Sequence, residues 1–487
     1  MIKFILNNED INTDQPSGST VLDFVRYHKD LKGTKIGCRE GDCGACTILV
    51  GELVEDKVRY RSMTSCLMPL ANAAGKHIVT IEGINPTDGS LTPVQQAMVD
   101  ESGTQCGFCT VGFVMSLTGA CIDGSDKISA IDGNICRCTG YKSIERAACR
   151  LSEPGAIATG FRGVVPDYFE HIPLRLTSLL ENGVIVADSS SRPLTQAVLT
   201  GGGTDLYVQR HDEMAESAAM PLLYNNELRG ITDTGTHIEI GASATVTNLL
   251  ESPLMNEIFP KLYDHLKLVS STPIRNMATL AGNLVNASPI GDMTVWFLAL
   301  DADITLGTSP HDSNGVIRTL PLKDLYLGYK QLAKQPDEII TAIRFKRPTG
   351  DFRFNFEKVC KRTYLDIASV NTAISLEIES KPGAAWVPPV LRGELPDASG
   401  ASEIDYVITS AHVSAGGVAP IPLYLRITSE FLVGRTINEE TIDAANEIIQ
   451  SEISPISDVR GSEQYKRLLL KQLFSAHFYE LFNQNAV

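Results

Sequence analysis

Short alternating and β-branched runs dominate the first part of the chain, up to about residue 87. Such runs are typical of strands, whereas the apolar spacing of Val21–Val25 indicates one short helix between them. The predicted strands are Ile2–Asn7, Thr47–Val50 and His77–Ile81. Residues 1–87 are therefore predicted to form a β-rich domain.

A helical pattern replaces the strands near residue 90. Thr92 suits a helix cap, Pro93 the first turn, and Gln95 the position from which a side chain reaches back in a capping box. Apolar residues then recur at helical spacing in residues 109–121, and Ser143–Ala148 suits a further helix. We therefore predict an all-α domain at residues 88–165.

The rest of the chain mixes strands and helices after a stretch with Gly and Pro, residues 155–173, which is typical of a linker. We predict an α+β domain at residues 175–350 and a final α/β domain at residues 352–487, with a surface excursion at 381–400. The expected strands are His237–Ala242 and Ile374–Ile378, and the expected helices are Thr247–Met255, with Thr245 or Thr247 near its cap, Glu439–Ile453 and Tyr465–Phe482.

The overall composition is that of a globular protein, with 43% hydrophobic and 21% charged residues among 487. A net charge of −16 argues against binding to nucleic acid or to an anionic membrane surface. The first residues lack the long apolar stretch of a signal peptide, and no run of about 18 apolar residues indicates a membrane span. A cytoplasmic protein is therefore expected.

Cysteine usage changes this ordinary picture, because ten of the eleven cysteines precede residue 150. A disulfide framework would require an oxidising compartment, and the sequence carries no export signal. Clustered cysteines in a cytosolic chain are more often metal ligands. Three of the eleven cysteines, Cys121, Cys149 and Cys360, match no ligand position and are expected to be small buried apolar residues.

The first cysteine motif has the spacing C-x4-C-x2-C and a distant fourth cysteine, which is typical of plant-type [2Fe–2S] proteins. Glycines at positions 37, 41 and 44 would allow positive φ angles and leave backbone N–H groups free to point at a cluster. A four-cysteine zinc site is the alternative, but zinc sites favour paired short spacings. The predicted ligands are Cys38, Cys43, Cys46 and Cys66.

The second cysteine motif combines C-x2-C with C-x-C inside the predicted all-α domain. Alone, C-x2-C is compatible with zinc or with a redox disulfide, whereas the short bite of C-x-C is awkward for a disulfide. Both pairs fall at predicted helix ends, and helix N-termini favour a cluster of net negative charge. The predicted ligands are Cys106, Cys109, Cys136 and Cys138.

These two motifs in this order, together with Gln105–Thr110 and Asn134–Tyr141, resemble the iron–sulfur region of the xanthine dehydrogenase family of molybdenum hydroxylases. The resemblance implies a ferredoxin-like β-grasp domain with one [2Fe–2S] cluster and a four-helix domain with a second. It also implies that Gln105 lies near the molybdopterin of a partner subunit.

Two segments of the next domain suit a flavin. A glycine-rich turn at Thr200–Leu206 would let backbone N–H groups approach a diphosphate, although a plain glycine turn is the alternative and the spacing disfavours a Rossmann fold. Small and polar residues around Gly282, within Pro273–Leu284, suit a second approach to the same diphosphate. Asp292 suits a ribitol or ribose hydroxyl.

Together these segments resemble the FAD domain of the same family, whose fold is like that of vanillyl-alcohol-oxidase flavoproteins. Residues 416–420 and 456–462 resemble the C-terminal domain of the carbon monoxide dehydrogenase flavoprotein type. Val269 falls where relatives place a residue against the flavin ring, and Lys358 falls at a flavin-edge position. The FAD contacts implied are Thr200, Gly201, Gly202, Gly203, Thr204, Asp205, Leu206, Val269, Thr279, Gly282, Asn283, Asp292 and Lys358.

Three positions depart from the family pattern. Ala281 stands where glycine is usual, and Val269 stands where relatives carry an aromatic residue. Leu365 replaces the first of an acidic pair, and in NAD-using relatives an acid there lies close to the nicotinamide side. NAD⁺ is the expected electron acceptor. Val269 and Leu365 are the positions whose departure from the family pattern would indicate a different acceptor.

The resemblance implies an electron-transfer subunit of a purine-hydroxylating dehydrogenase that oxidises hypoxanthine and xanthine to urate. Electrons would pass from molybdopterin, held in a partner subunit, through two [2Fe–2S] clusters to FAD and NAD⁺, with no catalytic residue here. The expected assembly is a heterotetramer of two small and two large chains. The alternatives are an aldehyde, carbon monoxide or N-heterocycle dehydrogenase, a stand-alone NADH-dependent reductase, and a zinc-binding adaptor.

Overall fold

The computed structural model describes residues 1–153, 163–181, 198–308, 317–362, 364–382 and 404–482. Two compact units make up the chain, and each is described by itself. Unit 1 comprises Met1–Asn226, Thr245–Asn248 and Ser270–Gly282, and unit 2 comprises Glu227–Ala244, Leu249–Val269 and Asn283–Val487.

Unit 1 begins with a five-stranded mixed sheet in the order β2-β1-β5-β3-β4, in which only β1 and β5 run parallel. One face covers a short helix, α1 (Val21–Asp23), that continues directly as a π-helical turn (Phe24–His28). The strands are β1 (Ile2–Leu6), β2 (Glu9–Thr13), β3 (Thr47–Val54), β4 (Lys57–Thr64) and β5 (His77–Val79).

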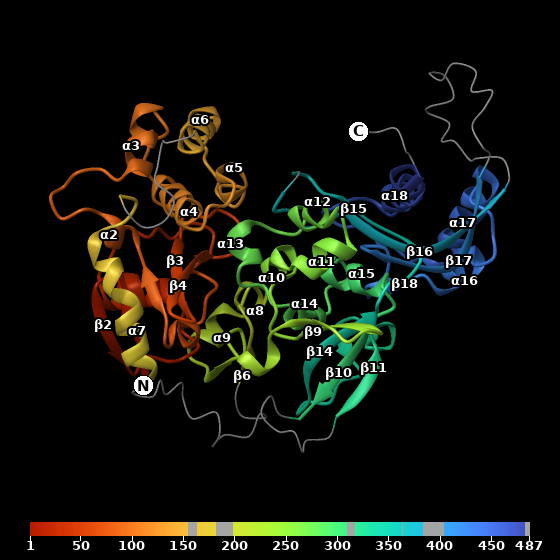
Figure 1. Cartoon of the computed structure of the whole chain (residues 1–487), viewed down its shortest axis with the longest axis horizontal. Coiled ribbons are helices and arrows are strands. Elements are labelled where there is room, and N and C mark those ends of the chain that lie inside the picture. The colour runs from red at the N-terminus through yellow and green to blue at the C-terminus, as the bar shows by residue number, and fades with distance from the viewer. Residues whose placement is uncertain (154–162, 182–197, 309–316, 363, 383–403, 483–487) are drawn as a thin grey trace. The chain divides into compact units, whose positions relative to one another are not determined.

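Four helices follow the sheet and pack on it through a shared apolar core (Figure 1). Phe113, Val114 and Leu117 of α4 lie in the same buried cluster as Leu49 and Tyr60 of the sheet, which fixes the helices to β3 and β4. The helices are α3 (Pro93–Asp100), α4 (Thr110–Asp123), α5 (Lys127–Ala130) and α6 (Lys142–Leu151), preceded by α2 (Ile81–Ile84).

The remainder of unit 1 holds short elements around a parallel strand pair. Thr200 ends the first of these strands and so leads directly into the predicted glycine turn. The elements are α7 (Ile172–Glu181), β6 (Val198–Thr200), α8 (Leu206–Gln209), α9 (His211–Ala215), β7 (Ala219–Pro221) and α13 (Thr272–Arg275).

Unit 2 contains two antiparallel sheets. The first has the order β11-β10-β14-β9-β8, and its strands are β8 (Ile231–Asp233), β9 (His237–Gly241), β10 (Asp303–Gly307), β11 (Arg318–Pro321) and β14 (Ile339–Lys346). The second has the order β15-β16-β17-β18, and its strands are β15 (Asp351–Val359), β16 (Val370–Pro382), β17 (Ile404–Gly416) and β18 (Leu423–Tyr424). A small hairpin joins β12 (Tyr326–Gly328) to β13 (Gln331–Leu332).

Helices accompany both sheets of unit 2. Leu470, Phe474 and Phe478 of α18 share a buried cluster with Ile374 and Ile408 of the second sheet, so this helix supports that sheet. The helices are α11 (Pro253–Ile258), α12 (Leu262–Lys267), α15 (Asp292–Leu298), α16 (Arg426–Leu432), α17 (Glu439–Glu452) and α18 (Glu463–Phe482); α10 (Val246–Glu251) and α14 (Leu280–Asn286) each cross the boundary of the two units.

The observed elements confirm the α+β multidomain prediction, including the strand-rich start, the four helices and the capping box at Thr92. The predicted helix Thr247–Met255 is instead two helices, because Ser252 caps α11 and Pro253 begins it. Residues 155–162 of the predicted linker and residues 383–400 of the predicted excursion at 381–400 lie outside the described residues. The described remainder of the predicted linker contains a 3₁₀ turn, Asp167–His171, and the first residues of α7. Within the described part of the chain, no helix is both long and apolar enough to cross a membrane.

Candidate functional site

The first thiol quartet consists of Cys38, Cys43, Cys46 and Cys66. Three of these residues lie on the loop before β3, and the fourth follows β4. Their thiols interact in two pairs, Cys38 with Cys43 and Cys46 with Cys66. The backbone N–H of Glu40 donates to the sulfur of Cys38 at 3.3 Å, and that of Cys38 donates to the sulfur of Cys43 at 3.4 Å. The loop thus directs backbone donors at its own sulfurs.

The three glycines of this loop act in two ways. Gly41 and Gly44 adopt positive φ angles of 79° and 66°, as predicted. The same prediction was wrong for Gly37, whose lack of a side chain makes room instead, because a Cβ there would lie 2.4 Å from the sulfur of Cys43. Conformation and space therefore both require glycine around this quartet.

Hydrogen bonding between the paired thiols separates their pKa values. The bond to Cys43 lowers the pKa of the Cys38 thiol to about 5, and the bond to Cys66 lowers the pKa of the Cys46 thiol although burial opposes it. The same bonds, with burial, raise the pKa of Cys43 and of Cys66. Each pair therefore contains one thiol that ionises readily, and the thiolate is the form that binds metal.

The second thiol quartet consists of Cys106, Cys109, Cys136 and Cys138. Cys109 is the N-cap residue of α4, and the last two cysteines precede α6. The thiols again form two pairs, Cys106 with Cys138 and Cys109 with Cys136. Burial acts to raise the pKa of Cys136, but hydrogen bonds from the hydroxyl and the backbone N–H of Thr139 lower it. Unlike the buried Cys46 and Cys66, Cys106 and Cys138 are exposed.

The pairing of the thiols indicates whether a single metal ion or a [2Fe–2S] cluster suits the two quartets. All eleven cysteines are free thiols, so no disulfide competes for them. In the described part of the chain, no three or more His, Cys, Asp or Glu side chains are placed to hold one metal ion. A [2Fe–2S] cluster needs two protein ligands on each of its two irons, which is what two pairs of thiols provide. The donor set therefore fits one such cluster in each quartet.

The glycine turn, Thr200–Leu206, packs against a segment of unit 1 that we call the bridging segment, Ser270–Gly282. A Cβ at Gly202 would lie 1.9 Å from the carbonyl oxygen of Met277, and one at Gly201 would lie 2.4 Å from the hydroxyl oxygen of Thr279. Only glycine permits this approach. The two sequence segments that suited a diphosphate are thus adjacent in the fold.

Hydrogen bonds hold both sides of this junction. Asn72 donates from its side chain to the carbonyl oxygen of Gly201 at 2.9 Å, and the backbone N–H of Gly282 donates to the hydroxyl of Thr279 at 3.2 Å. Gly203 has a positive φ of 83° and leads into α8. These contacts fix the shape of the glycine turn. The FAD contacts assigned to Thr204, Asp205, Leu206 and their neighbours stay predictions.

Four predicted FAD contacts belong to unit 2. The ammonium group of Lys358 donates to Asp292 Oδ2 at 2.7 Å and to the carbonyl oxygen of Leu268 at 2.8 Å, and the Lys358 side chain is 1% exposed. Asn371 donates to Asp292 Oδ1 at 2.6 Å. Each carboxylate oxygen of Asp292 thus has a protein donor and keeps a further lone pair.

The other two of these predicted contacts are Asn283 and Val269. Asn283 Oδ1 accepts from the backbone and the hydroxyl of Thr294, which fixes its orientation at the start of α15, and Val269 is buried. Lys358 is therefore a buried ion-pair residue rather than a solvated surface lysine, and its predicted flavin role stays a prediction.

Asn134, beside the cysteines of the second motif, has a structural role that was not predicted from the sequence. Its side chain donates to the carbonyl oxygen of Gly44 at 3.2 Å and accepts from the hydroxyl of Ser116 at 2.9 Å. The sequence did carry one signal for this role, because a polar residue stands two positions before a metal-ligand motif. Asn134 joins the loop of the first quartet to that of the second.

The remaining singled-out residues lie as follows. Gln105 is exposed beside the second quartet. Leu365 is buried with a positive φ of 74°, a left-handed conformation that costs a bulky residue energy. Cys121 is buried as expected, and burial raises the pKa of its thiol to about 11. The same expectation was wrong for Cys149, which is exposed, and Cys360 is only half-buried.

Four protein families match the chain in sequence order. They are the 2Fe-2S iron-sulfur cluster binding domain at residues 4–71, the [2Fe-2S] binding domain at 80–149, the FAD binding domain in molybdopterin dehydrogenase at 184–347, and the CO dehydrogenase flavoprotein C-terminal domain at 397–481. The two thiol quartets fall within the first two matches, and the glycine turn falls within the third.

Individual relatives agree with these families. The chain is 27% identical to xanthine dehydrogenase 1 of Arabidopsis thaliana, over 96% of this chain and 39% of that protein. It is also 27% identical to xanthine dehydrogenase of Emericella nidulans, over 99% of this chain and 39% of that protein. The chain thus spans about two fifths of the length of these curated relatives.

A solved structure of carbon monoxide dehydrogenase from Hydrogenophaga pseudoflava is similar in fold, with a TM-score of 0.50 and 22% identity, covering 59% of this chain and 90% of that one. The family matches, together with the thiol quartets, define an iron–sulfur flavoprotein: two [2Fe–2S]-binding domains followed by an FAD-binding domain. The chain is thus similar to the iron–sulfur and FAD-bearing part of the molybdenum hydroxylases.

Proposed function

We propose that the chain is the electron-transfer subunit of a xanthine dehydrogenase. The observation that carries this proposal is that two curated xanthine dehydrogenases align with 96% and 99% of the chain. When bound, the two [2Fe–2S] clusters carry single electrons and FAD collects pairs of them for NAD⁺. The substrate side, oxidation of hypoxanthine and xanthine to urate, belongs to a molybdopterin-bearing partner subunit in this proposal, with Gln105 near the interface.

The residues of this chain have the task of holding and tuning these groups. The eight cysteines of the two quartets supply the thiolates, in the pairs described above. Backbone donors such as Glu40 N–H at Cys38 stabilise the negative charge that reduction adds to sulfur. In this proposal the glycine turn, Thr279 and Gly282 of unit 1 would present backbone to the FAD diphosphate, and Val269, Asn283, Asp292 and Lys358 of unit 2 would be further FAD contacts.

A different acceptor is the second candidate, and Leu365 is the observation that favours it. An apolar side chain stands where NAD-using relatives carry an acid, and its backbone is held at a φ of 74°. The same role in an aldehyde, carbon monoxide or N-heterocycle dehydrogenase is the alternative on the substrate side. We propose a cytoplasmic location, where thiols remain reduced and available to iron, and a heterotetramer of two small and two large chains.

The test is anaerobic co-purification of the tagged chain from its own cells, with analysis for iron, sulfide, FAD and molybdenum. We expect about four irons per chain, two for each cluster, one FAD, and co-purifying molybdenum. Xanthine should bleach the flavin absorbance and reduce NAD⁺. A colourless, zinc-loaded chain, or full NADH-dependent reductase activity in the absence of any molybdenum protein, would contradict the proposal.

Matched cysteine substitutions locate the iron. Cys38→Ser and Cys106→Ser should each remove about half of the iron, because each breaks one quartet. Cys149→Ser is the control, since this exposed cysteine lies in neither quartet. Xanthine-dependent reduction of a dye but not of NAD⁺ would establish the second candidate instead.

A further inference from the structure

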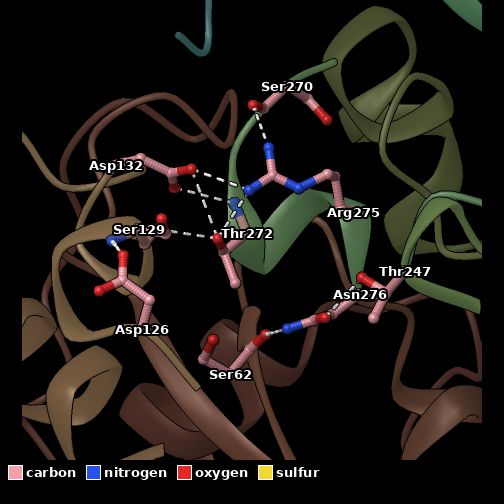
Figure 2. A network of polar contacts seen from close by, with 9 residues as sticks. All are labelled: Ser62, Asp126, Ser129, Asp132, Thr247, Ser270, Thr272, Arg275 and Asn276. Carbon is pink, nitrogen blue, oxygen red and sulfur yellow. Dashed lines mark hydrogen bonds and ion pairs between the residues drawn. The ribbon is translucent and has the colours of Figure 1, made fainter. Parts of the chain in front are cut away.

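A buried ion pair joins the helices around the second quartet to the bridging segment (Figure 2). Arg275 Nη2 donates to Asp132 Oδ2 at 2.8 Å, and the two side chains are only 5% and 3% exposed. The other guanidinium nitrogen, Nη1, donates to the carbonyl oxygen of Ser270 at 2.7 Å. Two charges removed from water to this extent must each be well paired, because an unpaired buried charge is costly.

The pair is part of a larger polar network in the same place. The backbone N–H of Thr272 donates to Asp132 Oδ1 at 2.9 Å, and its hydroxyl donates to the carbonyl oxygen of Ser129 at 2.9 Å. Arg275 also donates to the Thr272 hydroxyl at 2.8 Å. Figure 2 shows Arg275 and Thr272, from the bridging segment, meeting Asp132 and Ser129 from the end of α5 and the turn after it. The carboxylate of Asp132 is thus held at both oxygens by one short piece of chain.

Successive residues of that piece contact different parts of unit 1. Ile274 packs on Gly41 of the first quartet's loop, where a Cβ would lie 2.8 Å from Ile274 Cδ1. Asn276 donates to the carbonyl oxygen of Ser62 in β4 at 2.8 Å. Met277 and Thr279 then pack on the glycine turn. Ten consecutive positions, 270 to 279, therefore touch α5, a cluster loop, the sheet and the glycine turn.

We infer that Arg275 and Asp132 are positioning residues that couple FAD binding at the glycine turn to the helical domain of the second quartet. The inference rests on the proposed FAD site. A ligand that reduces the motion of the glycine turn also reduces the motion of Met277 and Thr279, which pack on it. Because Arg275 lies only two residues before Met277, the motion of Asp132 and α5 is then reduced as well. Coupling of this kind is reciprocal, so an ordered α5 in turn favours FAD.

The experiment uses the full chain with its clusters, stripped of flavin, and measures amide hydrogen exchange in residues 126–132 with and without saturating FAD. In the unsubstituted protein FAD should slow exchange there about fivefold or more, the lower end of ordinary coupling. In Arg275→Met and in Asp132→Asn this FAD-dependent slowing should disappear while both clusters keep their visible absorbance. A purely structural role would raise exchange equally with and without FAD and leave the fivefold difference in place.

Two further variants keep the outcome decisive. Arg275→Lys retains the positive charge but not the forked guanidinium, so it replaces Arg275→Met in the experiment if that variant fails to fold, and it should show a reduced FAD effect. Arg318→Met is the matched control, because it removes an arginine that contacts Glu338 at 2.7 and 2.8 Å in unit 2, and it should leave the FAD effect on α5 intact. An unchanged FAD effect in the Arg275 variants overturns the inference. Absence of FAD binding to the unsubstituted chain would instead overturn the proposed function.

Discussion

The backbone N–H of Ile135 donates a hydrogen bond to the carbonyl oxygen of Cys43 at 3.0 Å. Cys43 belongs to the first thiol quartet, and Ile135 is the residue directly before Cys136 of the second. A single hydrogen bond therefore links the two quartets through backbone. Asn134 strengthens the same contact, because its side chain bonds to Gly44 and Ser116.

Replacing this asparagine should weaken the junction of the two quartets. Asn134→Ala leaves the buried Ser116 hydroxyl without its acceptor, which costs about 1–3 kcal/mol. The Gly44 carbonyl keeps its bonds from Thr47 but loses the link to the loop of the second quartet. The measurement is the urea midpoint at which the visible absorbance of the clusters is lost. Asn256→Ala is the control, because that exposed asparagine also makes two hydrogen bonds but water can replace them. Equal midpoints for the two variants would refute this account of the junction.

Adding one methyl group to the glycine turn should reduce the affinity for FAD. Gly202 has no positive φ, so alanine is allowed by the backbone, but its Cβ would lie 1.9 Å from the carbonyl oxygen of Met277. Overpacking of this kind costs about 1–3 kcal/mol, so Gly202→Ala should weaken FAD binding about tenfold or more. Gly328→Ala is the control, since its nearest neighbour is a flexible glutamine side chain at 3.3 Å. Calorimetric titration of FAD into flavin-free protein decides the matter.

The buried Lys358–Asp292 pair should contribute far more to stability than a surface pair of the same type. Lys358→Met leaves the Asp292 carboxylate buried without its cation, and breaking such a pair costs about 3–5 kcal/mol. Lys261→Met is the matched control, because Lys261 and Glu480 are 48% and 54% exposed, and such pairs contribute about 1 kcal/mol or less. Thermal or urea unfolding of unit 2 in the full chain measures both. A loss no larger than that of the control would show that the pair is not held as described.

Acidification should destabilise unit 2 through two buried histidines. Burial lowers the pKa of His265 to about 4 and that of His477 to about 3, against 6.5 when unfolded. Asn355 donates to Nδ1 of His477, so a second proton on that nitrogen would face another donor. Between pH 6.5 and 4 the unfolded chain binds protons that the folded chain does not. The stability is present above pH 6.5 and falls as pH drops, by about 1.4 kcal/mol per pH unit for each histidine.

Urea midpoints at pH 7.0, 6.0 and 5.5 would test this dependence. His477→Gln should flatten the decrease, since glutamine has no proton to gain in this range. His171→Gln, at an exposed position, should leave the decrease as it is. The same dependence of the urea midpoint on pH in the unsubstituted protein and in His477→Gln would contradict the lowered pKa assigned to His477.

Local signals in the sequence were sufficient for much of the fold and for the grouping of the cysteines. Thr92 and Gln95 form the expected capping box because all its groups lie within four residues. The break between α10 and α11 was missed, although Ser252 and Pro253 carried the signal, because apolar spacing continued through it. The pairing inside each quartet was beyond the sequence, because spacing alone does not say which thiols approach each other.

Long-range contacts account for the rest of what was missed. Nothing near Asp292 in sequence indicates Lys358, 66 positions away, as its partner. Asp132 and Arg275 carry no local signal either, since each is an unremarkable charged residue until the fold brings them together. Glycine patterns indicated where backbone comes close, but not whether the neighbour is a ligand or another segment of the chain.

The distance of 143 positions between Asp132 and Arg275 has a consequence for biosynthesis. A ribosome that has finished the cysteine-bearing region releases Asp132 into water long before its guanidinium partner is translated. In the nascent chain, Asp132 and Ser129 therefore lack their contacts with Thr272 and Arg275 until those residues emerge. The buried ion pair can therefore form only after translation has passed residue 275.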